Sequence, residues 1–121
     1  MFLTQAGSLL RIFVGERDKH HGKPLYEWIV RQAREKGLAG ATVLRGMMGF
    51  GANSVIHTFK IERLSEDLPV LIEIVDTREN LERFLTLIES EIGAGLATIE
   101  KVEVRVYRPA QNKKGVCPKV T

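Results

Sequence analysis

The sequence predicts one α+β domain in which two helices pack on one face of an antiparallel sheet, in the order β-α-β-β-α-β. Two segments repeat apolar residues at the spacing of an amphipathic helix. Four shorter segments alternate in polarity or run apolar, as strands do. The length of 121 residues allows one domain with a real core and is too short for two.

The first strand is predicted over residues 8–14, where apolar and other positions alternate. Its inward positions are Leu10, Ile12 and Val14. Gly15 ends the strand, and the polar residues 16–23 are expected to form a loop. Pro24 suits the first turn of a helix and Gly37 suits its end. The apolar positions between them recur at helical spacing: Leu25, Trp28, Ile29 and Ala33.

The middle of the chain is predicted to form two more strands. Residues 41–48 form the second strand and lead into a turn at residues 49–51. Residues 54–62 alternate as a returning arm or strand extension. After a connecting turn, residues 70–75 are an apolar run whose single acid is Glu73, as expected of a central strand.

The second helix and the last strand complete the order. Asp76 and Glu79 fit a capping box at the start of a helix that ends at Gly93. Its apolar positions are Leu81, Phe84, Leu85, Ile88 and Ile92. Residues 99–107 then alternate as a strand, and Pro109 closes the fold. The apolar positions of this strand are Val102, Val104 and Val106.

This order is the ferredoxin-like arrangement, which leaves one sheet face uncovered by helices. The face under the helices is predicted to hold Leu10, Ile12, Val70, Ile72, Ile74 and the Val102 to Val106 set. The opposite face is predicted to hold Arg11, Val43, Arg45, Leu71, Glu73, Glu103 and Arg105. A face that mixes apolar and charged residues suits a subunit interface, so we expect a homo-oligomer.

Charge and composition narrow the possible partners. The domain is expected at residues 1–109, followed by a disordered basic tail at 110–121. The tail holds three lysines and no acid, so it accounts for the whole net charge of +3 (3 − 3 = 0 for the body). Binding to nucleic acid normally needs a basic stripe on the folded domain. We therefore expect no nucleic-acid partner.

The single cysteine and the N-terminus carry little functional signal. Cys117 lies in the tail, cannot form an internal disulfide, and has no activating neighbour in the sequence. Residues 1–10 lack the features of a signal peptide, and no apolar run approaches the ~18 residues of a membrane span. The expected compartment is the cytoplasm.

The segment from Thr42 to Gly51 is the most informative for function. Its glycines, Gly46, Gly49 and Gly51, allow positive φ and close approach of another group to the backbone. With backbone amides and Arg45 nearby, such a turn suits a phosphate, and we favour this interpretation over a plain hairpin. Arg45 could hold the phosphate or pair with Glu73 or Glu103. Met47 and Met48 could line an adenine ring or fill the core.

The histidines and acids give weaker signals. Adjacent His20 and His21 in a polar loop are read as solvated side chains, so no metal site is predicted. His57 could meet a base or phosphate, or simply lie on the surface. The acids beside the helices fit solvated faces, and no nucleophile has a recognisable base, so we expect no catalytic site.

The sequence argues against two other families of the same topology, one of enzymes and one of RNA-binding domains. Residues 15–22 lack the glycine-arginine loop of acylphosphatases, and residues 70–75 lack the aromatic platform of RNA-recognition domains.

The second strand is entered through Gly40-Ala41-Thr42-Val43 and leads into the turn Gly49-Phe50-Gly51. Together with the β-α-β-β-α-β order, these residues resemble the PII superfamily of trimeric signalling proteins. The fuller pattern is Thr42-Val43-x-Arg45-Gly46-x-x-Gly49-Phe50-Gly51, followed by His57 and Leu64-Ser65-x-Asp67-Leu68-Pro69-Val70. This pattern is similar to an uncharacterised PII-like branch known mainly from hypothetical bacterial and archaeal proteins.

The resemblance implies a homotrimer that binds an adenine nucleotide in clefts between subunits. It further implies that the loop after the second strand signals to an unidentified regulated protein, such as a membrane transporter or channel. It assigns nucleotide-binding roles to the first loop (Thr42, Gly46, Gly49, Phe50 and Gly51), to the loop after the second helix (Gly93, Ala94 and Gly95), and to Arg105 and Arg108 near the phosphates. Arg45 and His57 complete the candidate nucleotide-binding residues on the chemistry given above. No cofactor beyond the effector nucleotide is implied.

Two departures refine this expectation. Residues 51–68 form a shorter loop than in the nitrogen regulators and contain no tyrosine, so there is no acceptor for uridylylation. The loop at residues 93–95 contains no lysine, which favours AMP or ADP over ATP. The alternatives are a metal-linked trimer resembling copper-tolerance proteins of this fold and a small phosphate-ester enzyme.

Overall fold

The computed structural model describes residues 6–51 and 67–110. Its elements are β1 (Ala6–Gly15), β2 (Lys19–His20), β3 (Lys23–Pro24), α1 (Leu25–Glu35), β4 (Thr42–Arg45), β5 (Pro69–Asp76), α2 (Arg78–Ile88), the short 3-10 helix η2 (Glu89–Glu91) and β6 (Leu96–Glu103). The predicted arm at 54–62, His57, and the tail at 111–121 with Cys117 lie outside the described residues.

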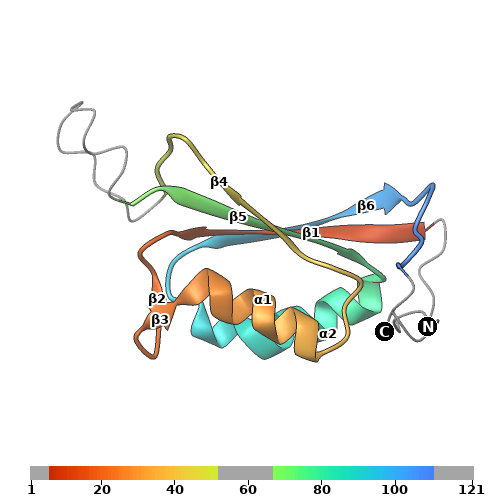
Figure 1. Ribbon diagram of the computed structural model, residues 1–121, viewed down its shortest axis with the longest axis horizontal. Coiled ribbons are helices and arrows are strands. Elements are labelled where there is room, and N and C mark those ends of the chain that lie inside the picture. The colour runs from red at the N-terminus through yellow and green to blue at the C-terminus, as the bar shows by residue number, and fades with distance from the viewer. Residues whose placement is uncertain (1–5, 52–66, 111–121) are drawn as a thin grey trace.

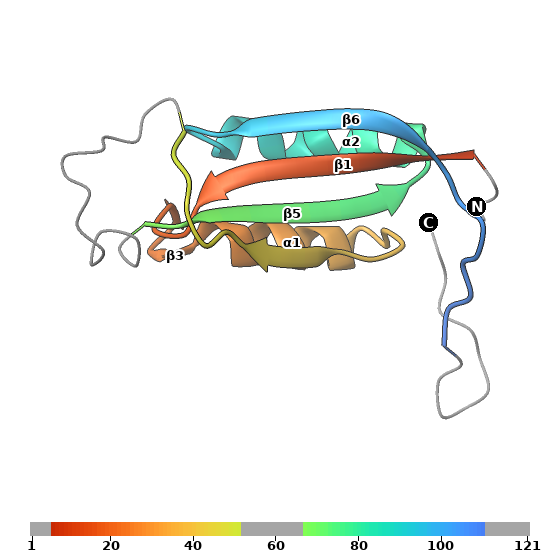
Figure 2. The same cartoon turned by 90° about the horizontal axis from the view of Figure 1, so that it is seen from above.

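The main sheet is antiparallel and has the strand order β4-β5-β1-β6. Helices α1 and α2 cover one face of this sheet, and within residues 6–51 and 67–110 the other face carries no helix (Figures 1 and 2). The predicted ferredoxin-like fold is therefore confirmed. The prediction of a loop at residues 16–23 was wrong, because this segment contains the two-stranded hairpin of β2 and β3.

The core lies between the sheet and the helices. In β1 and β5 every second residue is buried, so the predicted inward positions Leu10, Ile12, Val70, Ile72 and Ile74 are confirmed. They pack with buried side chains of the helices, namely Leu25, Ile29, Ala33, Leu81, Phe84 and Ile88. Apolar burial of this kind contributes about 25 cal/mol per Å². The core therefore fixes which sheet face stays open.

The prediction of which β6 residues lie under the helices was wrong. Residues opposite each other on antiparallel strands project to the same face. Ile99 pairs with buried Leu10, whereas Val102 pairs with Gly7. Ile99 therefore lies on the helix side and Val102 on the open face. Residues 104–107, predicted as strand, follow the end of β6 at Glu103, and Val106 is exposed.

The register of the two outer strands also shows that the sheet face predicted for three further residues was wrong. Val43 and Arg45 of β4 pair with the buried Ile72 and Val70, so they lie on the helix side, and Thr42 and Leu44 lie on the open face. Glu103 pairs with Ala6, and Ala6 lies on the same face of β1 as the buried Ser8. Glu103 therefore also lies on the helix side. Alternation alone could not show which set of residues faces the core.

Local signals fix the end of α1 and the start of α2. After α1, Gly37 has φ 75°, its N–H donates to the carbonyl of Arg34 at 3.1 Å, and the N–H of Leu38 donates to Ala33 at 3.1 Å. This is the Schellman ending that glycine favours. The capping box predicted for α2 was wrong, because the N-cap is Thr77, whose Oγ1 accepts from the N–H of Asn80 at 3.2 Å.

We expect Thr77→Ala to lower the free energy of unfolding by about 1 kcal/mol, because the substitution leaves a helix N–H without its acceptor. Urea unfolding at fixed protein concentration would measure this loss. Thr77→Ser should retain most of the stability, since serine also caps. Thr86→Ala, at an exposed position in the last turn of the same helix, is the matched control. An equal loss at Thr86 would contradict the assigned cap.

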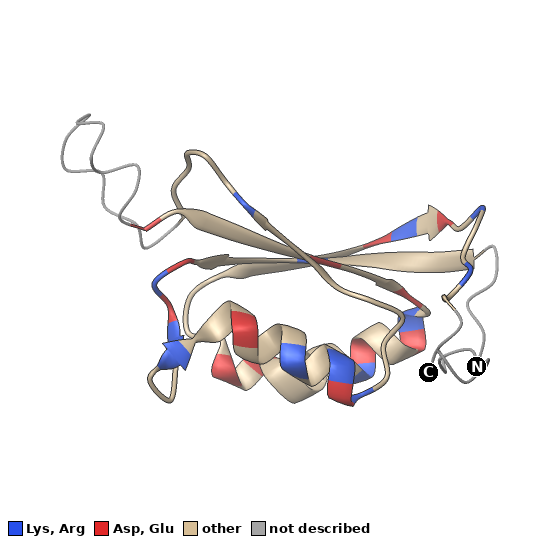
Figure 3. Ribbon diagram, viewed as in Figure 1, with Lys and Arg blue, Asp and Glu red and all other residues tan. Residues whose placement is uncertain are grey.

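Charges of both signs alternate along the outer surfaces of the helices (Figure 3). Among the described residues, this pattern differs from the single-sign stripe that polyanion binding needs. On the open face, charges are paired across three strands. The Arg11 Nε–Glu73 Oε2 and Arg11 Nη1–Glu100 Oε1 distances are both 3.0 Å. The guanidinium charge of Arg11 is therefore paired with two carboxylates of the same chain.

Candidate functional site

The glycine turn begins where β4 ends. The N–H of Gly46 donates to the carbonyl of Pro69 at 2.7 Å. A Cβ at Gly46 would lie 2.7 Å from Pro69 Cγ, and one at Gly49 would lie 3.1 Å from it. Neither glycine has positive φ. Glycine is therefore required at these two positions because the backbone lies close to Pro69. The left-handed backbone suggested by the sequence is absent at both of them.

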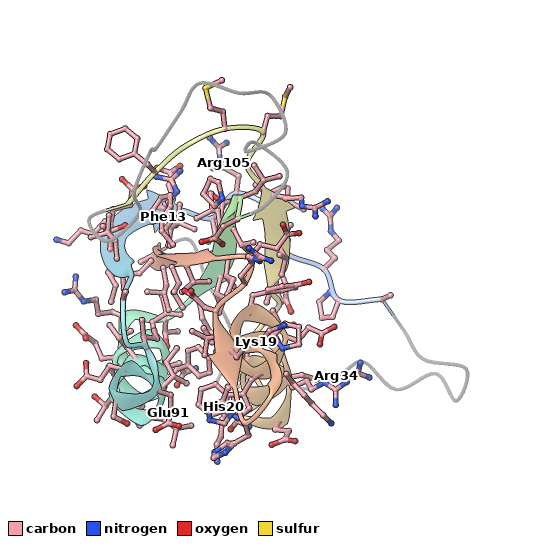
Figure 4. The ribbon with its side chains drawn as sticks, turned by 90° about the vertical axis from the view of Figure 1, so that its left-hand side faces the viewer. Phe13, Lys19, His20, Arg34, Glu91 and Arg105 are labelled. Atoms are coloured by element: carbon pink, nitrogen blue, oxygen red, sulfur yellow. The ribbon has the colours of Figure 1, made fainter. Side chains whose placement is uncertain are left out.

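The rest of the turn presents apolar side chains to solvent. Met47, Met48 and Phe50 are 90%, 70% and 72% exposed, so these methionines do not fill the core. Residues 46–51 arch over the end of the sheet, from β4 toward β6 (Figures 2 and 4). Exposed methionine and aromatic side chains together form an adaptable apolar surface.

Arg45 has a partner that the sequence did not suggest. Its Nη2 donates to Glu16 Oε2, and both Glu16 and Arg45 lie at the end of the sheet where β1 finishes. Glu73, one partner considered for Arg45, is bonded to Arg11 instead. Arg45 is 61% exposed in its side chain, so a ligand could compete with Glu16 for its guanidinium.

The second predicted loop lies at the same end of the sheet, on the opposite edge. Gly93 and Gly95 precede β6, whose first residue, Leu96, pairs with Phe13 near the end of β1. A Cβ at Gly95 would lie 2.6 Å from the carbonyl oxygen of Phe13, whereas one at Gly93 would meet nothing within 4 Å. Gly95 is therefore required by packing, and Gly93 and Ala94 stay open to solvent.

The predicted arginines lie at the other end of the sheet. Arg105 follows β6 and is exposed, with its Nε 3.6 Å from Glu103 Oε1. Arg108 is also exposed. The segment that carries them turns across the beginning of β1 toward the α1 side (Figure 2), where the Tyr107 hydroxyl donates to the carbonyl of Ala39 at 3.2 Å. This hydrogen bond holds the segment after β6 against the residues that precede β4, at the other edge of the sheet.

A cavity of about 610 Å³ opens at this second end, on the uncovered sheet face. Its walls come from the open face, the approach to β4 and the crossing segment, and include Leu9, Gly40, Thr42, Glu73, Val102 and Arg105. Thr42 and Arg105, both predicted for nucleotide binding, share this cavity. The volume suits a small organic ligand.

A buried carboxylate supports the wall of the cavity. Asp76 is 1% exposed, and it accepts hydrogen bonds from the N–H of Ala39 at 2.8 Å, the N–H of Thr77 at 2.6 Å and Asn80 Nδ2 at 2.9 Å. Burial raises the pKa of the Tyr107 hydroxyl above its ordinary value, and the carboxylate of Asp76 raises it further. This role of Asp76 was not predicted from the sequence, because its position before Glu79 also fits a local capping pattern.

One chain therefore holds the predicted residues in two separate groups. Arg45, Gly46, Gly49, Phe50, Gly51, Gly93, Ala94 and Gly95 lie toward the end of the sheet where β1 finishes. Arg105 and Arg108 lie toward the end where β1 begins. Thr42 lies between the two groups, opposite Glu73 and Arg11 in the middle of the sheet. Seven residue steps along β6 separate these ends by roughly 23 Å. The two groups do not converge on one ligand within a single chain.

Solved structures identify the class of fold. CPII from Thiomonas intermedia K12, bound to ADP and bicarbonate, superposes with a TM-score of 0.60 at 16% identity, covering 82% of this chain and 88% of that chain. A second CPII structure, described as a nitrogen regulatory PII-like protein bound to ADP, AMP and bicarbonate, gives 0.59 at 15% identity, covering 82% and 94%. The chain has the fold of PII-like proteins.

Sequence comparison gives the family. Residues 7–104 match the family model DUF190, described as "Uncharacterized ACR, COG1993". A UPF0166 protein of Aquifex aeolicus is 44% identical over 96 residues, 79% of this chain and 90% of that protein. The UPF0166 protein MJ1524 of Methanocaldococcus jannaschii is 43% identical over 77 residues, 64% and 70% of the two chains. The chain belongs to the DUF190 family, and the predicted resemblance to PII-like proteins is confirmed for the fold.

Within the described part of the chain, neither helix has the length and apolar character that a membrane crossing demands.

Proposed function

We propose that this protein is a PII-like regulator, without catalytic activity of its own, that binds an adenine nucleotide in clefts between the subunits of a homotrimer. The observation that carries the proposal is the shared fold with CPII, whose structures contain ADP and AMP. The glycine turn after β4 adds independent support, because it has exposed backbone, an arginine and an adaptable apolar surface.

The separation of the two residue groups supports a site between subunits. Residues roughly 23 Å apart along a sheet cannot contact one nucleotide in the same chain. A second copy packed against the open face could bring its Arg105 toward the glycine turn of the first. The apolar residues Leu44 and Leu96, 48% and 57% exposed, would then be covered.

The loop at residues 93–95 supports a preference for AMP or ADP. It offers backbone groups and open space at Gly93 but no cationic side chain. Glu89 and Glu91 lie just before it and add negative charge. A third phosphate would meet repulsion without a compensating lysine.

The segment after β4 is proposed to relay the bound state to a partner protein, for which a membrane transporter or channel is one candidate. Met47, Met48 and Phe50 supply an exposed apolar surface that a protein partner could cover. A nucleotide can change the arrangement of this segment only through different contacts in its two states. Arg45, which can exchange Glu16 for a phosphate, supplies such a difference.

Calorimetric titration with AMP, ADP, ATP and cyclic AMP would test the proposal, with light scattering to measure the mass of the assembly. We expect a trimer that binds AMP or ADP more tightly than ATP. Arg105→Ala should weaken binding about tenfold, the effect of losing one charge-assisted hydrogen bond. Arg78→Ala is the matched control, since Arg78 pairs with Glu82 on the helix surface.

Failure of every nucleotide to bind at millimolar concentration would refute the proposed ligand. A monomeric protein that still binds nucleotide would refute the cleft between subunits. Equal weakening by Arg105→Ala and Arg78→Ala would remove Arg105 from the site.

A further inference from the structure

A second cluster of ligand-type side chains lies beside the start of α1 and the end of α2 (Figure 1). It consists of His20 and His21 on the β2–β3 hairpin and Glu91 on η2. Figure 4 shows His20 and Glu91 side by side, although they are 71 residues apart in the chain. The histidines were predicted to be solvated because nothing in the sequence places Glu91 beside them.

The geometry of the cluster is compact. His20 Nε2 lies 2.7 Å from Glu91 Oε1, and one ligand atom from each of the three residues falls within 4.8 Å of the others. The ring of His20 is stacked on Trp28, with centroids 4.0 Å apart and an interplanar angle of 22°. Ser90 Oγ donates to Glu91 Oε2 at 3.4 Å. Neighbouring groups thus orient two of the three side chains, as around many metal ligands.

The hairpin turn explains how adjacent histidines can share one site. Neighbouring residues of an extended strand point to opposite faces. His21 and Gly22 instead have φ of 52° and 82°, the left-handed pair of a two-residue type I′ turn. The His21 ring consequently lies edge-on to His20, with centroids 4.3 Å apart. Left-handed φ is uncommon for a residue with a side chain and is often found at functional sites.

We infer that His20, His21 and Glu91 bind a divalent transition-metal ion of the zinc class. Two imidazoles and a carboxylate are ligands that zinc accepts, and three protein ligands leave a fourth position for water. The same donors are poor for magnesium, which prefers oxygen ligands in octahedral geometry. Metal insertion would replace the His20–Glu91 hydrogen bond and part those two atoms to roughly 3.3 Å, as tetrahedral zinc bonds require.

The exposure of the ligands allows this adjustment. The Glu91 side chain is 38% exposed and can rotate, whereas His20 is 14% exposed and is held by Trp28. The bound ion would connect the hairpin before α1 to the end of α2, two residues ahead of Gly93. None of the three ligands is a proposed nucleotide contact, although Glu91 lies beside the loop at residues 93–95. Zinc binding and nucleotide binding are measured separately, so either inference can fail without the other.

Zinc binding to tag-free full-length protein would test the inference, by equilibrium dialysis and by the visible absorption of cobalt(II) in the same site. We expect one ion per subunit, retained in excess magnesium, and a higher thermal midpoint with zinc because the ion binds the folded state. His21→Asn and Glu91→Gln should each weaken zinc binding by about tenfold or more. Asparagine tolerates left-handed φ, so the turn should survive.

Glu89→Gln, on the same turn of η2, is the matched control and should bind zinc as tightly as the unchanged protein. Absence of zinc binding by the unchanged protein would overturn the inference. So would binding that persists in the doubly substituted His21→Asn, Glu91→Gln protein, because the ion would then occupy other groups. A cobalt spectrum of octahedral type, which is weak and unaffected by either substitution, would also overturn it.

Discussion

Asp76→Ala is expected to lower the free energy of unfolding by about 4 kcal/mol, because it removes the acceptor of three hydrogen bonds inside the protein. The donors are the backbone N–H groups of Ala39 and Thr77 and the side chain of Asn80. With Asp76 only 1% exposed, water cannot easily replace the lost carboxylate. Each unsatisfied buried donor costs about 1–3 kcal/mol.

The substitution should act beyond the start of α2. Ala39 connects the carboxylate of Asp76 to the hydroxyl of Tyr107 through its own N–H and carbonyl. Loss of Asp76 frees the approach to β4 and the segment that carries Arg105. We therefore expect faster amide hydrogen exchange at Ala39 and in residues 104–107, as well as lower overall stability.

Urea unfolding at a fixed subunit concentration would measure the loss, since assembly couples stability to concentration. Glu79→Gln is the matched control: it replaces the exposed acid of the capping box predicted from the sequence, and its effect should be within about 0.5 kcal/mol. Asp76→Asn should fall between the two, because it retains one acceptor oxygen. If Glu79→Gln were as damaging as Asp76→Ala, the buried network would not be the source of the stability.

The strands and helices were predictable because each obeys its own period. Leu10, Ile12 and Ile72 alternate in their strands, and Leu81, Phe84 and Ile88 repeat at helical spacing. Local periodicity determines these elements, so one sequence suffices to find them. The face of β6 was not predictable in this way. Both of its faces hold apolar residues, and the register with β1, set by distant residues, places Ile99 and not Val102 under the helices.

The site residues show the same limit. Gly46 and Gly49 stood out in the sequence, but the reason for them, Pro69, is about twenty residues further on. His20 and His21 were visible as a pair, while Glu91 gave no signal of its proximity. Asp76 matched a local capping pattern and instead serves a contact with Ala39, which is 37 residues away. Residue types indicate chemistry, but the tertiary fold decides which residues share a site.

Gly95→Ala is expected to lower the free energy of unfolding by about 2 kcal/mol, because the added methyl group would lie 2.6 Å from the carbonyl oxygen of Phe13. That oxygen belongs to the backbone of a central strand and cannot move without disturbing β1 and β6. The φ of Gly95 is not left-handed, so the cost is steric. The nearby Ile92 Cγ2, at 3.1 Å from the added atom, limits escape in the other direction.

Gly93→Ala is the matched control in the same loop, because an added Cβ there meets nothing within 4 Å and the backbone is not left-handed. Its stability should be unchanged or slightly higher, as alanine restricts the unfolded chain. Urea unfolding of the two variants would separate them, and equal losses would contradict the packing role of Gly95. Nucleotide titration of Gly93→Ala adds a separate test of the loop. If a phosphate approaches the backbone at Gly93, this variant should lose affinity without losing stability, a combination that packing alone cannot produce.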